Sequence, residues 1–174
     1  IGVCHKERLL DLFENFILFD KSRGSVTKLI ARNHQFIGVN KAIENIQHKD
    51  QLFKLGKISV EEKQKLGVFW HTQGSGKSYS MVFFFQKIHH KFTGSYTFLI
   101  VTDRNGLDTQ IYGTFSGIGA VPQVKAGSRD SLQASSGSHL RELLSSEHRY
   151  LFTLIHKFNF EEEITKRDNI IVIS

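Results

Sequence analysis

Apolar residues recur at helical spacing over the first part of the chain. Over Glu7–Phe19 the large apolar side chains lie three or four positions apart, which predicts an amphipathic helix. A strand is predicted over Val26–Ala31. Asn33 is then expected to cap a second helix that runs to about Gln47, because the same spacing returns. The polar, lysine-rich stretch His48–Lys65 shows no clear periodicity, so we expect it to be a long connection.

After this connection the pattern changes to short apolar runs separated by helices. Strands are predicted at Gly67–Trp70, Tyr96–Thr102, Val121–Val124, Tyr150–Ile155 and Asn169–Ile173. Helices are predicted at Lys77–His90, Leu107–Phe115 and His139–Ser145. Strands that alternate with helices indicate crossover units, and hence an α/β fold with a mostly parallel sheet flanked by helices. In such sheets ligands bind beyond the carboxyl ends of the strands.

The turn after the first of these strands has the composition of a phosphate-binding loop. His71-Thr72-Gln73-Gly74-Ser75-Gly76-Lys77-Ser78 follows an apolar run and opens a helix, which is the context of a Walker A motif. Its glycines let backbone N–H groups point at phosphate oxygens, and the helix N-terminus adds its dipole. Lys77 is expected to reach the β- and γ-phosphates and Ser78 to ligate Mg²⁺. The strict motif has Gly where His71 stands, and the alternative is a solvated Gly/Ser turn.

Most enzymes with such a loop also use an acidic residue on a neighbouring strand to hold Mg²⁺. Asp103 directly follows the apolar run that ends at Thr102, so its position suits this role. The other possibility is an acid beyond Ser174, and the pattern alone leaves both open. Asp50, Glu61 and Lys63 loosely fit a nuclease pattern, but they lie in the charged connection, so no nuclease site is expected there.

Composition and charge favour a globular domain with a polyanionic partner. The 174 residues are 40% hydrophobic and 23% charged, which are globular values. The 23 Lys and Arg residues against 17 Asp and Glu residues give a net charge of +6, which suits a nucleotide or nucleic acid. The single cysteine, Cys4, excludes an internal disulfide and favours a reducing, cytoplasmic compartment. The apolar runs are too short to span a bilayer, so no membrane partner is expected.

Four segments resemble sequence blocks of one known family, in the family's order: Arg32–Gln35, Gly67–Ser78, Val101–Gln110 and Thr153–Phe158. The family is the restriction (R, or HsdR) subunit of type I restriction-modification enzymes. Gly67–Ser78 is close to its Walker A block, and Val101–Gln110 is similar to its motif Ia. Arg32–Gln35 resembles its adenine-reading glutamine segment. Thr153–Phe158 resembles a later block, which usually carries Gln where His156 stands.

The resemblance implies the first RecA-like motor domain of a superfamily 2 helicase-like translocase, in which His71 is a regular variant of the Walker A loop. In this family an apolar strand runs into an acidic Asp-Glu-Ala-His box, the Walker B motif, and Ile170–Ile173 looks like that strand. The chain is therefore expected to be a fragment that ends just before the box, which makes Asp103 a motif Ia residue. The expected organisation is an N-terminal helical and adenine-contacting segment (1–48), a polar connection (49–66) and the truncated motor domain (67–174).

The resemblance also assigns nucleotide-binding roles, with ATP and Mg²⁺ as cofactors. Gln35 is expected to hydrogen-bond the adenine edge, and the alternative is that its amide only caps the helix or packs. The triphosphate is expected to be held by Thr72, Gln73, Gly74, Ser75, Gly76, Lys77 and Ser78. Of these, Lys77 and Ser78 are the expected catalytic residues.

A second set of residues is expected to face DNA and to couple it to the nucleotide. It consists of Thr102, Asp103 and Arg104, with Thr153, Lys157 and Phe158 on the same track. Arg104 is expected to contact phosphate, while Asp103 orients the loop. The alternatives are a solvated charge for Lys157 and a core position for Phe158.

The resulting hypothesis is the ATP-binding part of a type I restriction endonuclease motor subunit. Such a subunit translocates double-stranded DNA before cleavage and assembles with modification and specificity subunits; the fragment alone is expected to be inactive. A second hypothesis is another P-loop ATPase or kinase with Asp103 as the Mg²⁺ acid. A third is a nucleotide-binding module without turnover.

Overall fold

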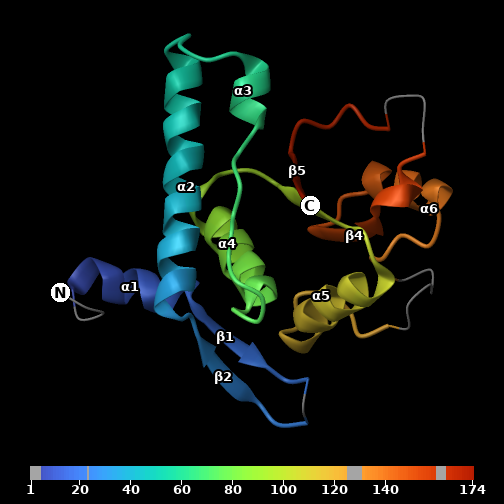
Figure 1. The fold of residues 1–174 in the computed structure, drawn as a ribbon, viewed down its shortest axis with the longest axis horizontal. Coiled ribbons are helices and arrows are strands. Elements are labelled where there is room, and N and C mark those ends of the chain that lie inside the picture. Colours follow the sequence, from blue (N-terminus) through green and yellow to red (C-terminus); the bar gives the residue numbers. More distant parts are fainter. Residues whose placement is uncertain (1–4, 23, 125–130, 160–163) are drawn as a thin grey trace. The chain divides into compact units, whose positions relative to one another are not determined.

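The computed structural model describes residues 5–22, 24–124, 131–159 and 164–174. The chain divides into two compact units, and most of their helices and strands are labelled in Figure 1. The first unit comprises Ile1–Leu18 and Lys28–Phe92, and the second comprises Phe19–Thr27 and Thr93–Ser174. Among the described residues, no helix combines the length and the apolar character needed to cross a bilayer.

Helices form most of the first unit: α1 (Lys6–Asn15), α2 (Asn33–Lys54), α3 (Val60–Gln64) and α4 (Lys77–Lys91). Strands β1 (Ile17–Asp20) and β2 (Thr27–Ile30) pair in a two-stranded sheet. The fully buried Phe16 anchors the core, with its ring centroid 4.7 Å from that of Phe36 and 5.6 Å from that of Phe83. Because Phe83 belongs to α4, this packing fixes the helix that follows the predicted phosphate loop.

A buried polar network joins three helices of the first unit. The ammonium group of Lys87 in α4, a residue only 2% exposed, pairs with Asp11 of α1 and hydrogen-bonds Asn40 of α2. The Asn15 amide donates to the Asp11 carboxylate at 2.9 Å. Burial opposes ionisation of Asp11, but the hydrogen bonds from Lys87 and Asn15 outweigh it and lower the pKa of this carboxyl group. The network therefore holds a compensated charge pair beneath α1 and α2.

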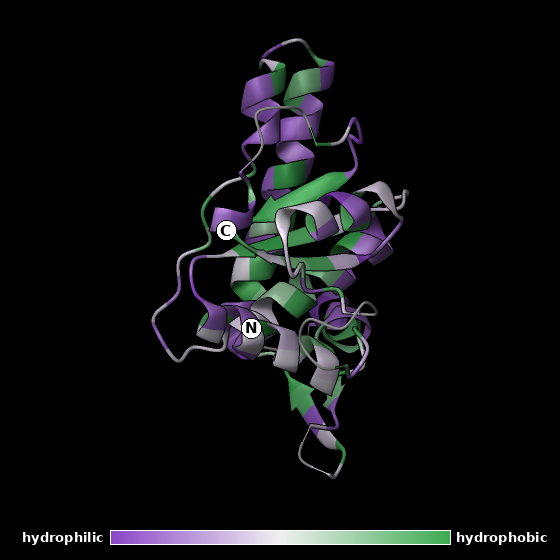
Figure 2. Ribbon diagram, turned by 90° about the vertical axis from the view of Figure 1, so that its right-hand side faces the viewer, coloured by the Kyte–Doolittle hydropathy of each residue, from purple (hydrophilic) through white to green (hydrophobic). Residues whose placement is uncertain are grey.

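The second unit is built on a parallel sheet in the order β4-β3-β5. Its strands are β3 (Thr97–Thr102), β4 (Tyr150–Leu154) and β5 (Ile170–Ile173). Helix α5 (Asn105–Gly117) follows β3, α6 (Gly137–Ser145) precedes β4, and a 3₁₀ turn (Ile155–Lys157) follows β4. Every residue of β3 and β4 is buried, as expected for parallel strands covered on both faces, and the strands are coloured as hydrophobic in Figure 2.

The two helices of this unit cover opposite faces of the sheet. On one face Leu99 and Val101 of β3 share an apolar cluster with Leu140 of α6. On the other face the ring of Phe115 in α5 meets that of Phe152 in β4 at a centroid distance of 5.3 Å and an angle of 79°. The predicted α/β fold, with a parallel sheet flanked by helices, is confirmed.

Two of the predicted strands are wrong. Gly67–Trp70 contains no strand residue, and Val68 and Trp70 are 95% and 80% exposed. Val121–Val124 is likewise irregular. An apolar run becomes a strand only where another strand pairs with it, and within the described residues none pairs with either segment.

The N-terminal elements also differ from the prediction. The first helix ends at Asn15, and Ile17–Asp20 forms β1, because this β-branched and aromatic run pairs with β2. Helix α2 continues to Lys54, past the predicted end at Gln47. The predicted connection His48–Lys65 therefore contains the last turns of α2 and the short helix α3.

Candidate functional site

The loop before α4 has the backbone of a phosphate-binding turn. Gly74 and Gly76 adopt φ values of +77° and +83°, a left-handed conformation that glycine adopts without strain. Gly76 is the N-cap of α4, which begins at Lys77. The first N–H groups of a helix have no partner within the helix and carry the positive end of its dipole. The predicted turn and helix of the Walker A motif are therefore present, while the preceding strand is not.

Lys77 folds back over this loop. Its exposed ammonium group donates to the backbone carbonyl of His71 at 2.8 Å and to that of Thr72 at 3.5 Å. The Ser75 hydroxyl and Nδ1 of His71 are buried without a hydrogen-bond partner among the described residues. Ser78 lies half-buried in the first turn of α4. An ammonium group, hydroxyl groups and left-handed glycines around one helix N-terminus are the groups that bind a polyphosphate and its Mg²⁺, so the residues fit ATP.

Gln35 connects the first turn of α2 to the loop. The buried side chain accepts a hydrogen bond from the Arg32 N–H at 2.9 Å and donates one to the Gly76 carbonyl at 3.0 Å. The first bond satisfies the backbone N–H of Arg32, the N-cap residue of α2. Both ends of the amide thus contact backbone, which agrees with the capping alternative. The adenine contact stays a prediction.

Two further residues of α2 approach the loop, and the sequence reasoning missed both. His34 Nε2 lies 3.1 Å from the Ser75 carbonyl, and its ring centroid is 5.0 Å from that of His71. A Cβ atom on Gly38 would come within 2.8 Å of the Phe69 ring, so a larger residue there would displace this ring. Residues four apart lie on one helix face, and this spacing is the only signal that could have linked His34 to Gly38.

The imidazole of His71 is surrounded by groups that disfavour its protonation. Burial lowers its pKa, and the positive charges of His34 and Lys77 lower it further. His71 is therefore neutral at pH 7, which leaves Lys77 as the cation of the loop itself. Its ring also contacts that of Phe69 in a tilted arrangement, at a centroid distance of 4.5 Å.

The second unit holds the residues predicted to face DNA. Asp103 and Arg104 directly follow β3, are exposed and pair with each other at 3.0 Å. Lys157 follows β4 and donates to the backbone carbonyl of Ala134. Thr102 and Leu154 are paired in the parallel register of β3 and β4, so the carboxyl ends of these two strands lie side by side at one edge of the sheet. The structure therefore brings Arg104 and Lys157 to the same edge.

Three other members of this set are not accessible in the same way. Thr102 and Thr153 are 5% and 1% exposed, so their side chains belong to the interior of the second unit. Phe158 packs against the apolar cluster around Leu140, as its core alternative predicts. These three side chains therefore pack inside the second unit and are not surface contacts for DNA.

The charged segment that loosely fits a nuclease pattern is held by ion pairs. Asp50 forms ion pairs with Lys54 at 2.6 Å and with Lys63 at 3.0 Å. All three residues lie on helices rather than adjacent strands. In the part of the chain that the structure describes, no group of three or more His, Cys, Asp or Glu side chains is arranged to hold a metal.

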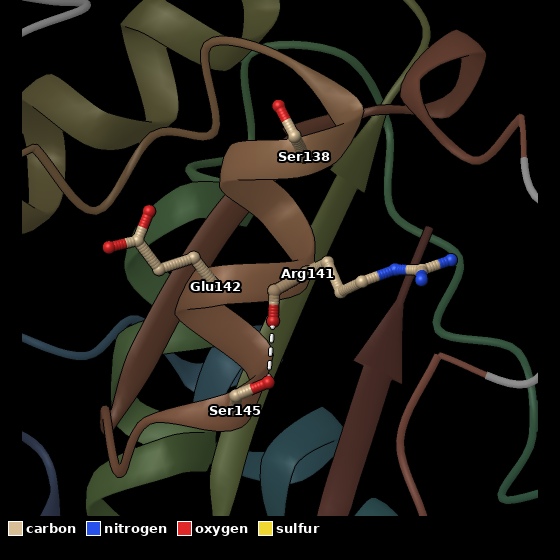
Figure 3. Close-up of a pocket in the computed structure, with 4 residues that line it drawn as sticks. All are labelled: Ser138, Arg141, Glu142 and Ser145. Carbon is tan, nitrogen blue, oxygen red and sulfur yellow. Dashed lines mark hydrogen bonds between the residues drawn. The ribbon is translucent and has the colours of Figure 1, made fainter.

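A pocket in the second unit lies along α6. Ser138, Arg141, Glu142 and Ser145 line it, and Figure 3 shows the side chains of Arg141 and Glu142 pointing away from each other. The Ser145 hydroxyl donates to the Arg141 carbonyl at 2.8 Å, an ordinary helix back-bond. None of these residues belongs to the predicted site.

Known proteins match almost the whole chain. The model of the SWI2/SNF2 ATPase family matches residues 34–174. The endonuclease subunit of the type I restriction enzyme HindI of Haemophilus influenzae is 37% identical over 187 residues, which cover 99% of this chain and 16% of that protein. The putative type I restriction enzyme MjaIXP endonuclease subunit of Methanocaldococcus jannaschii is 31% identical over 182 residues, which cover 100% of this chain and 16% of that protein. The chain thus spans about one sixth of the length of these relatives.

Proposed function

Because this chain belongs to the SWI2/SNF2 ATPase family, we propose that it is the ATP-binding part of the motor subunit of a type I restriction endonuclease. The complete subunit would hydrolyse ATP to translocate double-stranded DNA before cleavage. It would act in a complex with modification and specificity subunits. The proposal is supported by the relatives, which are endonuclease subunits of type I restriction enzymes.

The observation that carries the proposal is the loop at the start of α4. Left-handed Gly74 and Gly76 turn the backbone into the N-terminus of α4, and Lys77 is the first residue of that helix. Lys77 exchanges its contacts with the loop carbonyls for phosphate oxygens and offsets the charge that develops on them during transfer. The Ser78 hydroxyl would hold Mg²⁺. ATP, when bound, supplies the phosphoanhydride bond whose cleavage drives the motor.

Gln35 and His34 support this loop from α2. The hydrogen bond from Gln35 to the Gly76 carbonyl, at 3.0 Å, fixes the residue that precedes the catalytic lysine. The contact between His34 Nε2 and the Ser75 carbonyl, at 3.1 Å, fixes Ser75, the residue before Gly76. A loop held in its binding conformation loses less entropy when it binds the triphosphate, so α2 favours binding.

Two cations at the edge of the second unit, the exposed Arg104 and the half-buried Lys157, are the proposed DNA contacts. Arg104 and Lys157 follow the ends of adjacent parallel strands, where ligands of such sheets bind. Contacts from Arg and Lys to phosphates give affinity without base recognition, as a motor that moves along any sequence requires. Asp103 pairs with Arg104 at 3.0 Å, and this contact gives no support to the alternative in which Asp103 is the Mg²⁺ acid.

The test is ATP hydrolysis by the full-length subunit, assembled with its partner subunits, with and without double-stranded DNA. We expect Lys77→Ala to lower turnover at least about 100-fold, because it removes the cation that stabilises the transferring phosphoryl group. Lys91→Ala, at the exposed C-terminal end of the same helix, is the matched control and should keep wild-type turnover. Normal turnover in Lys77→Ala would refute the assignment of the loop.

A further inference from the structure

One buried carboxylate lies at the edge of the sheet where the proposed DNA contacts emerge. Asp108, 7% exposed, is in the first turns of α5. Its side chain accepts a hydrogen bond from the Thr102 hydroxyl at 3.3 Å, and its backbone N–H donates to the Arg104 carbonyl at 3.1 Å. The Asp108 carboxylate therefore holds the end of β3, and the backbone bond to Arg104, the N-cap residue, is the first of α5.

The same carboxylate reaches a second segment of the sheet edge. The Gln133 side chain, 8% exposed, donates to its other oxygen at 2.8 Å. Gln133 bridges to Phe152 of β4, and the neighbouring Ala134 accepts the hydrogen bond of Lys157. One side chain thus connects the end of β3 to the segment that holds Lys157.

The surroundings of Asp108 explain how a carboxylate is retained in the interior. Burial raises its pKa, while the hydrogen bonds from Gln133 and Thr102 and the nearby charge of Lys157 favour the ionised form. A buried carboxylate without hydrogen-bond partners costs free energy. The fold is therefore more stable when the end of β3 and the segment around Gln133 stay in place around Asp108. An apolar residue at position 108 would remove this constraint.

We propose that Asp108 is a positioning residue for DNA: through Thr102 and Gln133 it holds Arg104 and Lys157 in the arrangement that binds the phosphate backbone. The inference rests on the proposed motor function and deepens it. Asp108 itself is buried and does not touch DNA. Its effect is on the affinity of the subunit for DNA, and it leaves the nucleotide loop unchanged.

The experiment uses DNA-stimulated ATP hydrolysis by the full-length subunit in its complex. Two quantities are measured, the DNA concentration at half-maximal stimulation and the rate without DNA. Asp108→Ala should raise the half-saturating DNA concentration about tenfold, because it removes two hydrogen bonds to a charged group. Gln133→Met should raise it about fivefold, because it removes the hydrogen bond to Asp108. Gln133 is buried and is no proposed DNA contact, so its effect on DNA affinity is indirect. The rate without DNA should stay within about twofold of wild type in both.

Asp108→Asn is the matched control. Its amide oxygen can accept from Gln133 and its NH₂ group can donate to the Thr102 hydroxyl, so DNA affinity should stay close to wild type. An unchanged half-saturating DNA concentration in Gln133→Met would overturn the proposal, and this variant decides it if Asp108→Ala does not fold. A lowered maximal rate at unchanged half-saturation would also overturn it, because that is the result of a merely structural role. Absence of DNA stimulation in the unsubstituted protein would overturn the proposed function, and the inference with it.

Discussion

Gln35 offers a direct test of how α2 contributes to nucleotide binding. Its amide accepts from the Arg32 N–H at 2.9 Å and donates to the Gly76 carbonyl at 3.0 Å, and Gln35→Ala removes both bonds. The Gly76 carbonyl keeps its contacts with the Ser80 N–H and hydroxyl, so the loss there is partial. At about 1 kcal/mol for each net hydrogen bond, the change costs at most about 2 kcal/mol. If this energy holds the loop in its binding conformation, nucleotide affinity falls by up to about 30-fold.

The assay is the equilibrium binding of ATP and GTP to the full-length subunit, measured with each nucleotide separately. Because Gln35 acts on the loop backbone, we expect equal losses for the two nucleotides. Gln35→Glu is a second variant: its carboxylate can still accept from the Arg32 N–H, but it faces the Gly76 carbonyl without a donor, so affinity should fall as much as in Gln35→Ala. A loss confined to ATP would refute this reasoning and favour the adenine contact. Unchanged affinity would show that neither role operates.

Two further predictions concern the first unit. Asp11→Ala should destabilise the chain by about 3 kcal/mol, because it leaves the buried Lys87 ammonium group without its charge partner, and adding Lys87→Met should recover much of this loss; urea denaturation followed by circular dichroism measures both, and a double variant no more stable than Asp11→Ala would contradict it. The pKa of His71 is lowered in the folded state, so the unfolded chain binds more protons, and the stability that His71 contributes is present above its ordinary pKa of 6.5 and lost as the pH falls below it. The melting temperature should therefore fall more steeply between pH 7 and 5.5 in wild type than in His71→Gln, and parallel profiles would disprove this.

The parts of the molecule that the sequence predicted well are those with a strong local pattern. The glycines and Lys77 specify a tight turn and a helix start through their own backbone preferences, and both occur as predicted. The apolar runs at 97–102 and 150–154 are buried on both faces, so their lack of alternation indicated parallel strands. The resemblance to restriction subunits, drawn from four short blocks, is confirmed by relatives that match nearly the whole chain. The RecA-like α/β fold follows from the same family.

Where the prediction failed, the deciding contact is distant in the sequence. Ile17–Asp20 continues the apolar spacing of α1, and only pairing with β2 makes it a strand. Gly67–Trp70 is as apolar as a buried strand, but apolar composition does not supply a neighbouring strand. Local patterns report which residues prefer to be buried, whereas strand formation also depends on a partner.

Asp108 shows the same limit for function. In the sequence it is an acidic residue in the first turns of a helix, where a carboxylate interacts favourably with the helix dipole and needs no further explanation. Its proposed role depends on Gln133, which lies 25 positions away and belongs to no motif. The residues that contact phosphates can be recognised from the sequence, because loop and strand-end chemistry is local. The residues that position them are determined by packing, so a buried polar side chain with partners from two separate segments is the feature to look for once the fold is known.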